Sequence, residues 1–125
     1  MIAVDTSSLI AYLSGAQGPD VDSVERAFHD ELAVLPPPVL AEVLSDPVLL
    51  PELRHTLKEL PLLELTEGYW ERAGLLRARV LGSGRKARLA DALIAQSCLD
   101  VDVPLITRDR DFRHFARAAR LKVLP

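Results

Sequence analysis

The chain has 125 residues, of which 49% are hydrophobic and 26% charged, and its net charge is −3. This composition is typical of an ordinary globular domain and excludes a disordered, fibrous or disulfide-rich chain. The single cysteine, Cys98, excludes an intrachain disulfide and any zinc site built from several cysteines. No apolar run reaches the ~18 residues that a membrane-spanning helix needs. The N-terminus begins at once with a strand pattern, so we expect no signal peptide and one cytoplasmic domain over residues 1–125.

The charges are distributed unevenly along the chain. Residues 1–71 carry 13 acidic side chains against three basic ones, which gives a net charge of −10. Residues 72–125 carry 12 basic side chains against five acidic ones, which gives +7. The second half is therefore able to attract a polyanion, although charged helix faces exposed to water explain the same counts.

Short apolar runs alternate along the chain with longer segments of helical periodicity. In chain order, the first half is predicted to contain a strand at Ile2–Val4, helices at Leu9–Leu13 and Pro19–Glu31, a strand at Leu32–Leu35, a helix from about Pro38 to Leu44, a further helix that is punctuated by Pro47 and Pro51 and ends near Leu60, and a strand at Leu62–Leu65. The rest is predicted to contain a helix from Thr66 to Val80, a basic loop at Leu81–Lys86, a helix at Ala87–Leu99, a strand at Pro104–Thr107, a helix at Asp109–Ala119 and a strand at Leu121–Leu124. Strands that alternate with helices are typical of parallel βα units. We therefore expect an α/β fold, a three-layer α/β/α sandwich around a central, mostly parallel sheet.

Four acidic residues stand where such a fold places functional groups. Asp5 directly follows the first strand, and Asp109 follows the strand at Pro104–Thr107, so both lie at the carboxyl ends of strands, where open sheets bind ligands. Glu42 and Asp91 lie on predicted helices, and Asp91 is at the edge of an apolar stripe, where a carboxylate is uncommon. Four carboxylates in one pocket would repel each other, and Mg²⁺ removes that cost. The pattern indicates metal-assisted phosphodiester hydrolysis.

Four segments around these acids resemble the motifs of PIN-domain nucleases. They are Asp5-Thr6-Ser7-Ser8-Leu9-Ile10, Leu40-Ala41-Glu42-Val43, Asp91-Ala92-Leu93-Ile94-Ala95 and Thr107-Arg108-Asp109-Arg110-Asp111-Phe112. They occur in the order of that family and cover nearly the whole chain. The compact length is most similar to the VapC-type toxins of bacterial and archaeal toxin–antitoxin pairs.

The resemblance implies a Mg²⁺-dependent endoribonuclease, in which Mn²⁺ is expected to substitute. It also implies a homodimer and inhibition by a VapB-type antitoxin whose C-terminal tail enters the active-site groove. The implied catalytic residues are Asp5, Glu42, Asp91 and Asp109, of which Asp5, Asp91 and Asp109 are the implied metal ligands. The implied supporting residues are Thr6 or Ser7, which would orient the first carboxylate, Thr107, which would contact the phosphate or a water at the metal, and Asp111, an acid that only some relatives keep.

A basic segment precedes the predicted helix that carries Asp91. Arg85, Lys86 and Arg88 are expected to reach the phosphates that flank the cleaved bond, although a solvated loop explains them equally well. Binding of RNA by these side chains would weaken as salt is added.

Other interpretations of the same residues remain open. Asp5 fits a helix N-cap, Glu42 a surface glutamate, and Asp109 and Asp111 the first turn of a helix. On these interpretations the chain is a catalytically silent PIN-like scaffold that binds RNA or protein. A phospho-receiver module would need two adjacent acids after its first strand, and Asp5 stands alone.

Several other polar and aromatic residues carry no catalytic pattern. We expect solvated turns at Asp100 and Asp102, surface histidines, a buried thiol at Cys98, and aromatic side chains that pack in the core or at a dimer interface. The histidines and aromatic residues concerned are His29, His55, His114, Trp70, Phe112 and Phe115.

Overall fold

The structure, a computed structural model, describes all residues from 1 to 125. Four strands and seven helices alternate along the chain. The strands are β1 (Ile2–Val4), β2 (Ala33–Val34), β3 (Leu105–Ile106) and β4 (Val123–Leu124). The helices are α1 (Thr6–Leu13), α2 (Pro19–His29), α3 (Pro37–Leu44), α4 (Pro51–Glu59), α5 (Tyr69–Gly82), α6 (Leu89–Asp100) and α7 (Phe112–Ala119). No helix among them combines the length and apolarity that crossing a membrane requires.

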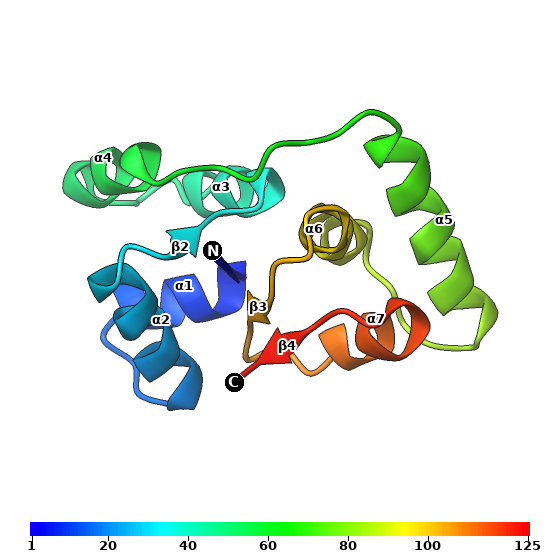
Figure 1. Ribbon diagram of the computed structural model, residues 1–125. Helices are drawn as coiled ribbons and strands as arrows, with labels where there is room; N and C mark the ends of the chain where they lie inside the picture. Colours follow the sequence, from blue (N-terminus) through cyan, green and yellow to red (C-terminus); the bar gives the residue numbers. More distant parts are fainter.

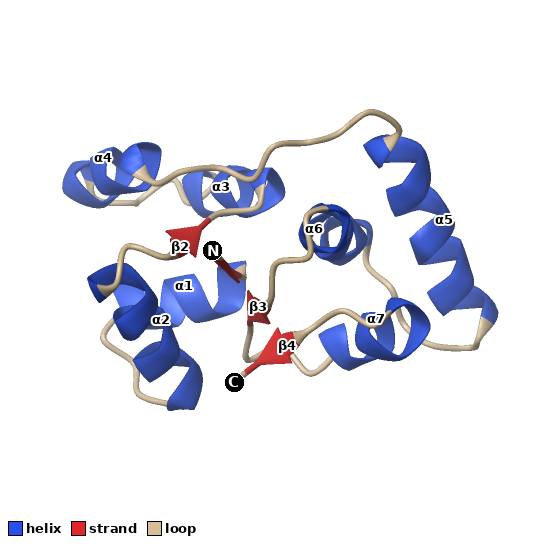
Figure 2. Cartoon of the chain, in the orientation of Figure 1, coloured by secondary structure: helices blue, strands red, loops and turns tan.

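The strands form one sheet in the order β2-β1-β3-β4, and all three pairings are parallel. Helices α1 and α2 lie on one side of this sheet and α6 and α7 on the other, with α5 outside them (Figure 1; Figure 2). Helix α3 contacts both α1 and α6. The expected α/β/α arrangement around a parallel sheet is confirmed.

The pairing of β1 with β3 places two distant parts of the chain side by side. Val4 is in register with Ile106, and both side chains are fully buried in the core. The next residue, Asp5, donates its backbone N–H to the carbonyl of Ile106 at 2.9 Å. Asp5 and Thr107 therefore leave the sheet together at its carboxyl edge, where parallel βα folds bind ligands.

Several helices begin at residues other than the expected ones, and two of these differences, in α1 and α7, bear on the acids. Helix α1 begins at Thr6, directly after β1, because the carbonyl of Asp5 already accepts the N–H of Leu9 at 3.0 Å. Asp5 occupies the N-cap position, but its side chain makes no capping hydrogen bond, so the carboxylate remains available for another role. Helix α7 begins at Phe112, which leaves Asp109 in the turn that precedes it.

The strand expected at Leu62–Leu65 is wrong. Only Leu62 pairs with the sheet, through a single parallel bridge to Leu35 beyond the end of β2. Two backbone hydrogen bonds support the bridge, from Leu35 to the carbonyl of Pro61 and from Leu63 to the carbonyl of Leu35, each of 2.9 Å. Pro61 has no N–H to extend the ladder, and this edge of the sheet has no further strand beside it.

The solvated turn expected at Asp100 is also wrong. This carboxylate is largely buried and receives Nε and Nη2 of Arg72 at 2.9 and 2.7 Å, which joins α5 to α6. Gln96 donates to it at 2.7 Å, and Thr66 at 3.3 Å. Burial alone would raise the pKa of Asp100, but these donors hold it below its ordinary value. Asp102, two residues later, is exposed as expected.

Replacing Asp100 tests this joint between α5 and α6. The Asp100→Ala variant is expected to lose about 2 kcal/mol of unfolding free energy, because Arg72 and Gln96 lose their shared acceptor. Asp102→Asn is the control, since the ion pair of Asp102 with Lys122 is exposed and contributes little, and asparagine tolerates the positive φ of this residue. Urea unfolding of both variants measures the difference. Equal losses would contradict the assigned role of Asp100.

Candidate active site

Asp5 is a buried acid at the carboxyl end of β1, with 3% of its surface exposed. Its Oδ2 accepts hydrogen bonds from the hydroxyls of Ser7 at 2.7 Å and Thr107 at 2.8 Å. Burial raises the pKa of Asp5, and the two hydroxyl donors oppose that rise. The carboxylate is thus held in one orientation by donors from α1 and from the end of β3.

Thr107 connects Asp5 to the acids that follow β3. Its hydroxyl donates to Asp5 and accepts the backbone N–H of Asp109 at 3.0 Å. Asp109 in turn accepts the backbone N–H of Asp111 through Oδ1 at 2.9 Å. This chain of hydrogen bonds fixes the turn between β3 and α7, and it joins residues that are about a hundred positions apart in sequence.

Asp91 lies in the first turn of α6, and 8% of its surface is exposed. Its Oδ2 is buried and has no hydrogen-bond partner. Burial, followed by the negative charges of Asp109 and Asp5, raises the pKa of Asp91 to about 7. A buried oxygen without a donor is costly and rare in folded proteins. A cation at this oxygen would remove the cost.

Three carboxylates meet closely enough to hold such a cation. Asp91, Asp109 and Asp111 each offer an oxygen atom that lies within 4.8 Å of the other two. Mg²⁺ binds oxygen ligands at about 2.1 Å, so two ligands on opposite sides of the ion lie about 4.2 Å apart. The donor set is made only of carboxylates, which suits a hard cation. These residues therefore fit a divalent metal ion.

The cluster of three differs from the expected ligand set by one residue. Asp111, expected only as a supporting acid, is in the cluster, whereas Asp5 is not. Asp5 is nevertheless near, because its charge raises the pKa of Asp91 and one of its oxygens is occupied by Ser7 and Thr107. Helix α7 begins at Phe112, so Asp111 precedes the helix and lies beside Asp109 in the cluster.

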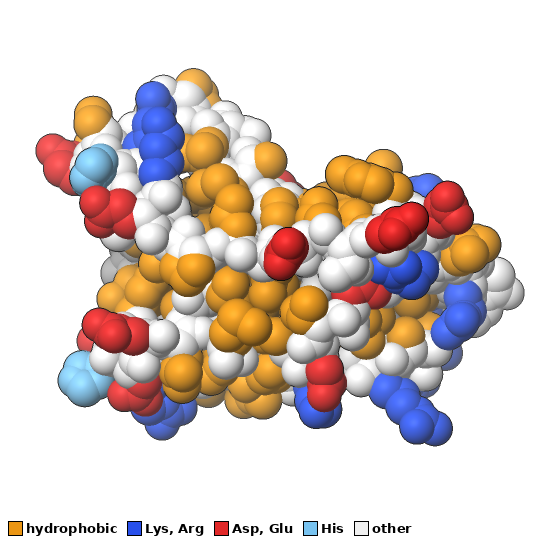
Figure 3. Space-filling view, turned by 45° about the horizontal axis from the view of Figure 1, so that its top comes forward, with side chains coloured by type: hydrophobic (Ala, Val, Ile, Leu, Met, Phe, Trp, Pro, Cys, Tyr) orange, Lys and Arg blue, Asp and Glu red, His pale blue; other side chains and the backbone are white.

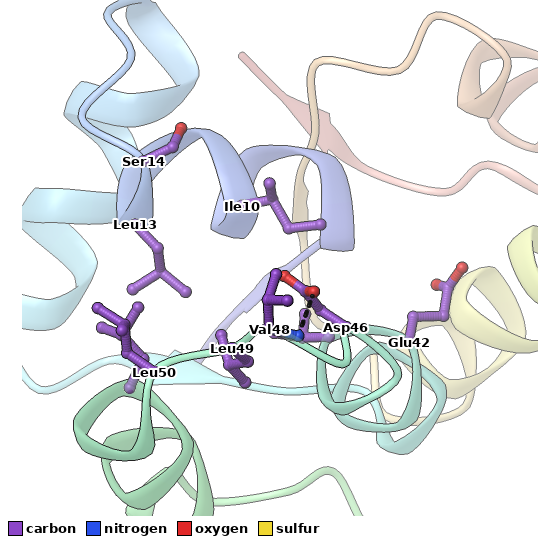
Figure 4. Close-up of a pocket in the computed structure, with 10 residues that line it drawn as sticks. Ile10, Leu13, Ser14, Glu42, Asp46, Val48, Leu49 and Leu50 are labelled. Atoms are coloured by element: carbon purple, nitrogen blue, oxygen red, sulfur yellow. Dashed lines mark hydrogen bonds between the residues drawn. The ribbon is translucent and has the colours of Figure 1, made fainter.

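Glu42 reaches the same region from α3. It is exposed and accepts the hydroxyl of Thr6 at 2.7 Å, which links α3 to the start of α1. Its charge contributes to the raised pKa of Asp91. Figure 4 shows its carboxylate directed away from Leu49 and Leu50, toward α6. The four expected acids are therefore brought to one region.

Glu42 also stands at the rim of an apolar cavity of about 230 Å³ between α1 and the segment that joins α3 to α4. Ile10 and Leu13 contribute from α1, and Val48, Leu49 and Leu50 from the opposite side (Figure 4). Ile10, Val48 and Leu50 are 49%, 80% and 60% exposed, so an apolar surface borders the acidic region.

The three expected RNA-binding cations divide into two groups. Lys86 lies 3.6 Å from the carboxylate of Asp111, and the charge of Arg88 lowers the pKa of Asp91, so both are beside the acids. Arg85 instead lines a separate hollow between α5 and α7.

An ion pair that the sequence did not indicate lies next to the site. Arg108 directs Nε and Nη2 at the largely buried carboxylate of Asp20, at 2.8 and 3.1 Å, and Nη2 also donates to the carbonyl of Gln17. Arg108 holds the pKa of Asp20 below its ordinary value. A Cβ at Gly18 would come within 2.8 Å of Asp20, so glycine leaves room for the pair. No periodicity or motif connects Asp20 with Thr107-Arg108.

The remaining expectations concern residues away from the acids. The expected burial of the Cys98 thiol is confirmed, and burial raises its pKa to about 12. Phe112 and Phe115 are in the core as expected, whereas Trp70 is 67% exposed. His29 and His55 are exposed, as expected for surface histidines.

Comparison with known proteins identifies the family. The PIN domain family model matches residues 2–118, and the chain therefore belongs to the PIN domain family. No curated protein matches the sequence.

Solved structures share the fold. FitAcB from Neisseria gonorrhoeae is 21% identical with a TM-score of 0.72, over 100% of this chain and 97% of that one. VapBC-5 from Mycobacterium tuberculosis, a member of the VapBC family of toxin–antitoxin systems, is 20% identical with a TM-score of 0.68, over 98% and 96%. VapBC2 from Rickettsia felis, solved with a promoter DNA fragment, is 18% identical with a TM-score of 0.72, over 99% and 98%. At these identities the likeness is one of fold.

Thermal unfolding tests the electrostatic cost at Asp91. Its raised pKa means that the metal-free protein loses stability as the pH rises from about 4 through 7, because the folded state disfavours the ionised carboxyl. At pH 8 without metal, Asp91→Asn is expected to raise Tm by roughly 5 °C, and the gap should close at pH 4.

The same measurement tests the cation. Millimolar Mg²⁺ is expected to raise the Tm of the unmodified protein at pH 8 and to leave that of Asp91→Asn nearly unchanged. Asp102→Asn, at an exposed carboxylate, serves as the control and should behave like the unmodified protein. If the Tm of the unmodified protein changes neither with Mg²⁺ nor with pH, the result contradicts the proposed metal site.

Proposed function

We propose that this chain is a Mg²⁺-dependent endoribonuclease and the toxin of a toxin–antitoxin pair. The observation that carries the proposal is the buried, unpartnered Oδ2 of Asp91, which belongs to a carboxylate whose oxygen lies within 4.8 Å of oxygens of Asp109 and Asp111. Membership of the PIN domain family and fold relatives that belong to toxin–antitoxin systems support it.

Mg²⁺ bound at these carboxylates would supply the charge that polarises a phosphodiester and lowers the pKa of the attacking water. The residues of the chain have distinct parts. Asp91 and Asp109, with Asp111 beside them, would hold the ion. Ser7 and Thr107 orient Asp5, and Thr6 orients Glu42, so that both negative charges face the same region.

Cations beside the acids support a phosphodiester substrate. Lys86 and Arg88 lie next to the carboxylate cluster, where they can bind phosphate oxygens on either side of the cleaved bond. RNA is proposed as the substrate because the four motifs resemble those of VapC-type ribonucleases.

The exposed apolar surfaces support protein partners. Trp70 and Leu75 are 67% and 70% exposed on α5, and Figure 3 shows apolar side chains gathered over the middle of one face. Large exposed apolar patches are typical of protein interfaces. We assign the exposed apolar side chains of α5 to a homodimer interface. We assign the apolar cavity beside Glu42 to the antitoxin, whose tail would then cover the acids.

The test of the enzyme is cleavage of a mixed RNA population by the pure protein with Mg²⁺, with Mn²⁺ and with EDTA. Cleavage is expected with either metal and not with EDTA. Asp91→Asn and Asp109→Asn are each expected to lower the rate at least about 100-fold, because the site loses a ligand charge. Asp102→Asn is the matched control and should cleave normally. Binding of RNA without any cleavage would instead support the scaffold function, and cleavage of DNA alone would refute the choice of RNA.

Growth of expressing cells tests the toxin assignment. Expression of the chain alone is expected to arrest growth, and Asp91→Asn is expected to relieve the arrest. Co-expression of the product of a small reading frame directly upstream of the gene is expected to restore growth as well. Normal growth during expression of an actively cleaving protein would contradict a toxin role.

A further inference from the structure

Helix α7 has two faces of opposite character. Phe112 and Phe115 are fully buried in the core. Arg113 and Arg117 are exposed, and Arg110 and Arg120, just outside the two ends of the helix, are exposed as well. Within the helix, Arg113 and Arg117 are four positions apart and share one face, and Arg110 and Arg120 flank the helix at its two ends. We name Arg110, Arg113, Arg117 and Arg120 the α7 arginine row.

The positive charges of the row are unpaired. None of the four side chains makes an ion pair or a side-chain hydrogen bond, in contrast to Arg72 and Arg108, which are both committed to buried carboxylates. Helix α7 contains no acidic residue at all. A face kept only for solvation usually mixes charges of both signs, and like charges three and four positions apart repel. The row is therefore arranged for an anionic partner.

The row begins at the candidate active site. Arg110 and Arg113 line a surface hollow of about 370 Å³ together with Thr107 and Asp109, two residues that build the acidic region. A phosphodiester at the acids therefore lies next to the first arginines of the row. Figure 1 shows α7 leading from the end of β3 toward the outer helix α5.

The row ends at a second group of cations. Arg117 lines a hollow of about 330 Å³ with Arg79 and Arg85, which come from the C-terminal half of α5 and the loop that follows it, and with His114. From Arg113 to Arg117 the helix rises about 6 Å. The guanidinium groups of these two residues are thus far enough apart to bind different phosphates of one strand.

We propose that the α7 arginine row, extended at its far end by Arg85, binds the phosphate backbone of the RNA on one side of the cleaved bond. This inference rests on the proposed function. Guanidinium groups bind phosphate through two parallel hydrogen bonds, which suits a row of free arginines. RNA is favoured over an acidic polypeptide because Asp109, which is proposed to hold the metal ion, lines the hollow at which the row starts.

The experiment measures RNA binding without cleavage. Fluorescence anisotropy gives the Kd of a labelled 20-nucleotide single-stranded RNA for the Asp91→Asn protein over a range of salt concentrations. Adding Arg113→Gln and Arg117→Gln is expected to weaken binding roughly tenfold at 0.1 M salt. It is also expected to reduce the slope of log Kd against log salt by about 1.4, since each phosphate contact in a single strand contributes about 0.7.

A matched pair of substitutions controls for loss of charge alone. Arg26→Gln and Arg54→Gln remove two exposed arginines from α2 and α4, outside the row, and are expected to leave both the Kd and the slope unchanged. Circular dichroism of both double variants establishes that they are folded. An unchanged Kd and slope in the row variant, or equal losses in the two double variants, would overturn the proposal.

The outcomes for the enzyme and for the row are separate. Cleavage by the unmodified protein tests the proposed function, whereas the anisotropy measurement needs no cleavage. Poly-glutamate serves as a probe for an acidic protein partner. If the row variant loses affinity for poly-glutamate and keeps its affinity for RNA, the row is a protein-binding surface and the inference is wrong.

Discussion

Repulsion between carboxylates is the constraint that shapes the functional end of this molecule. Asp5, Asp91 and Asp109 are brought together by the sheet and by α6, and burial, followed by the charges of Asp109 and Asp5, raises the pKa of Asp91 to about 7. The hydroxyls of Ser7 and Thr107 offset the cost of burying the Asp5 carboxylate, but no donor reaches Oδ2 of Asp91. Such an arrangement is costly unless something compensates it, and a divalent cation would both neutralise the charge and give this oxygen a partner. The buried carboxylate of Asp91 therefore explains both the expected loss of stability without metal and the proposed function with metal.

The parallel topology supplies the precision that this site requires. The strands are only two or three residues long, yet the pairing of β1 with β3 brings Asp5 and Thr107 to the same edge. One hydroxyl then does two things, since Thr107 donates to Asp5 and accepts the N–H of Asp109. The positions of Asp5 and Asp109 thus depend on each other through the side chain of Thr107, which carries no charge. Such shared donors orient carboxylates without adding a cation that would compete for them.

The sequence predicts the site better than it predicts the ends of the elements. Asp5 and Asp109 are recognisable because they follow apolar strands, and Asp91 because it interrupts an apolar stripe. Asp111 is harder to place, because its role depends on α7 beginning at Phe112 instead of three residues earlier. That start is set by hydrogen bonds that originate at the far end of the chain, through Thr107 to Asp5, and no local pattern contains them. The strand expected at Leu62–Leu65 is wrong for a related reason, since an apolar run does not show whether a neighbouring strand has free groups to pair with.

The uneven charge of the two halves of the chain is likewise explained only by contacts between residues that are distant in sequence. The net charge of −3 suggests little, yet the fold gives some cations of the second half a buried acid to pair with and leaves others without any acid. Arg72 and Arg108 are committed to buried carboxylates and hold elements together. Those on the outer face of α7 have no acid to pair with. Under the proposed function, a site that gathers acids would repel the polyanion that it cleaves, and a metal ion would compensate this only at the scissile phosphate. The neighbouring phosphates would then need cations of their own, and the unpaired arginines of α7, the helix that follows Asp109, are placed to provide them.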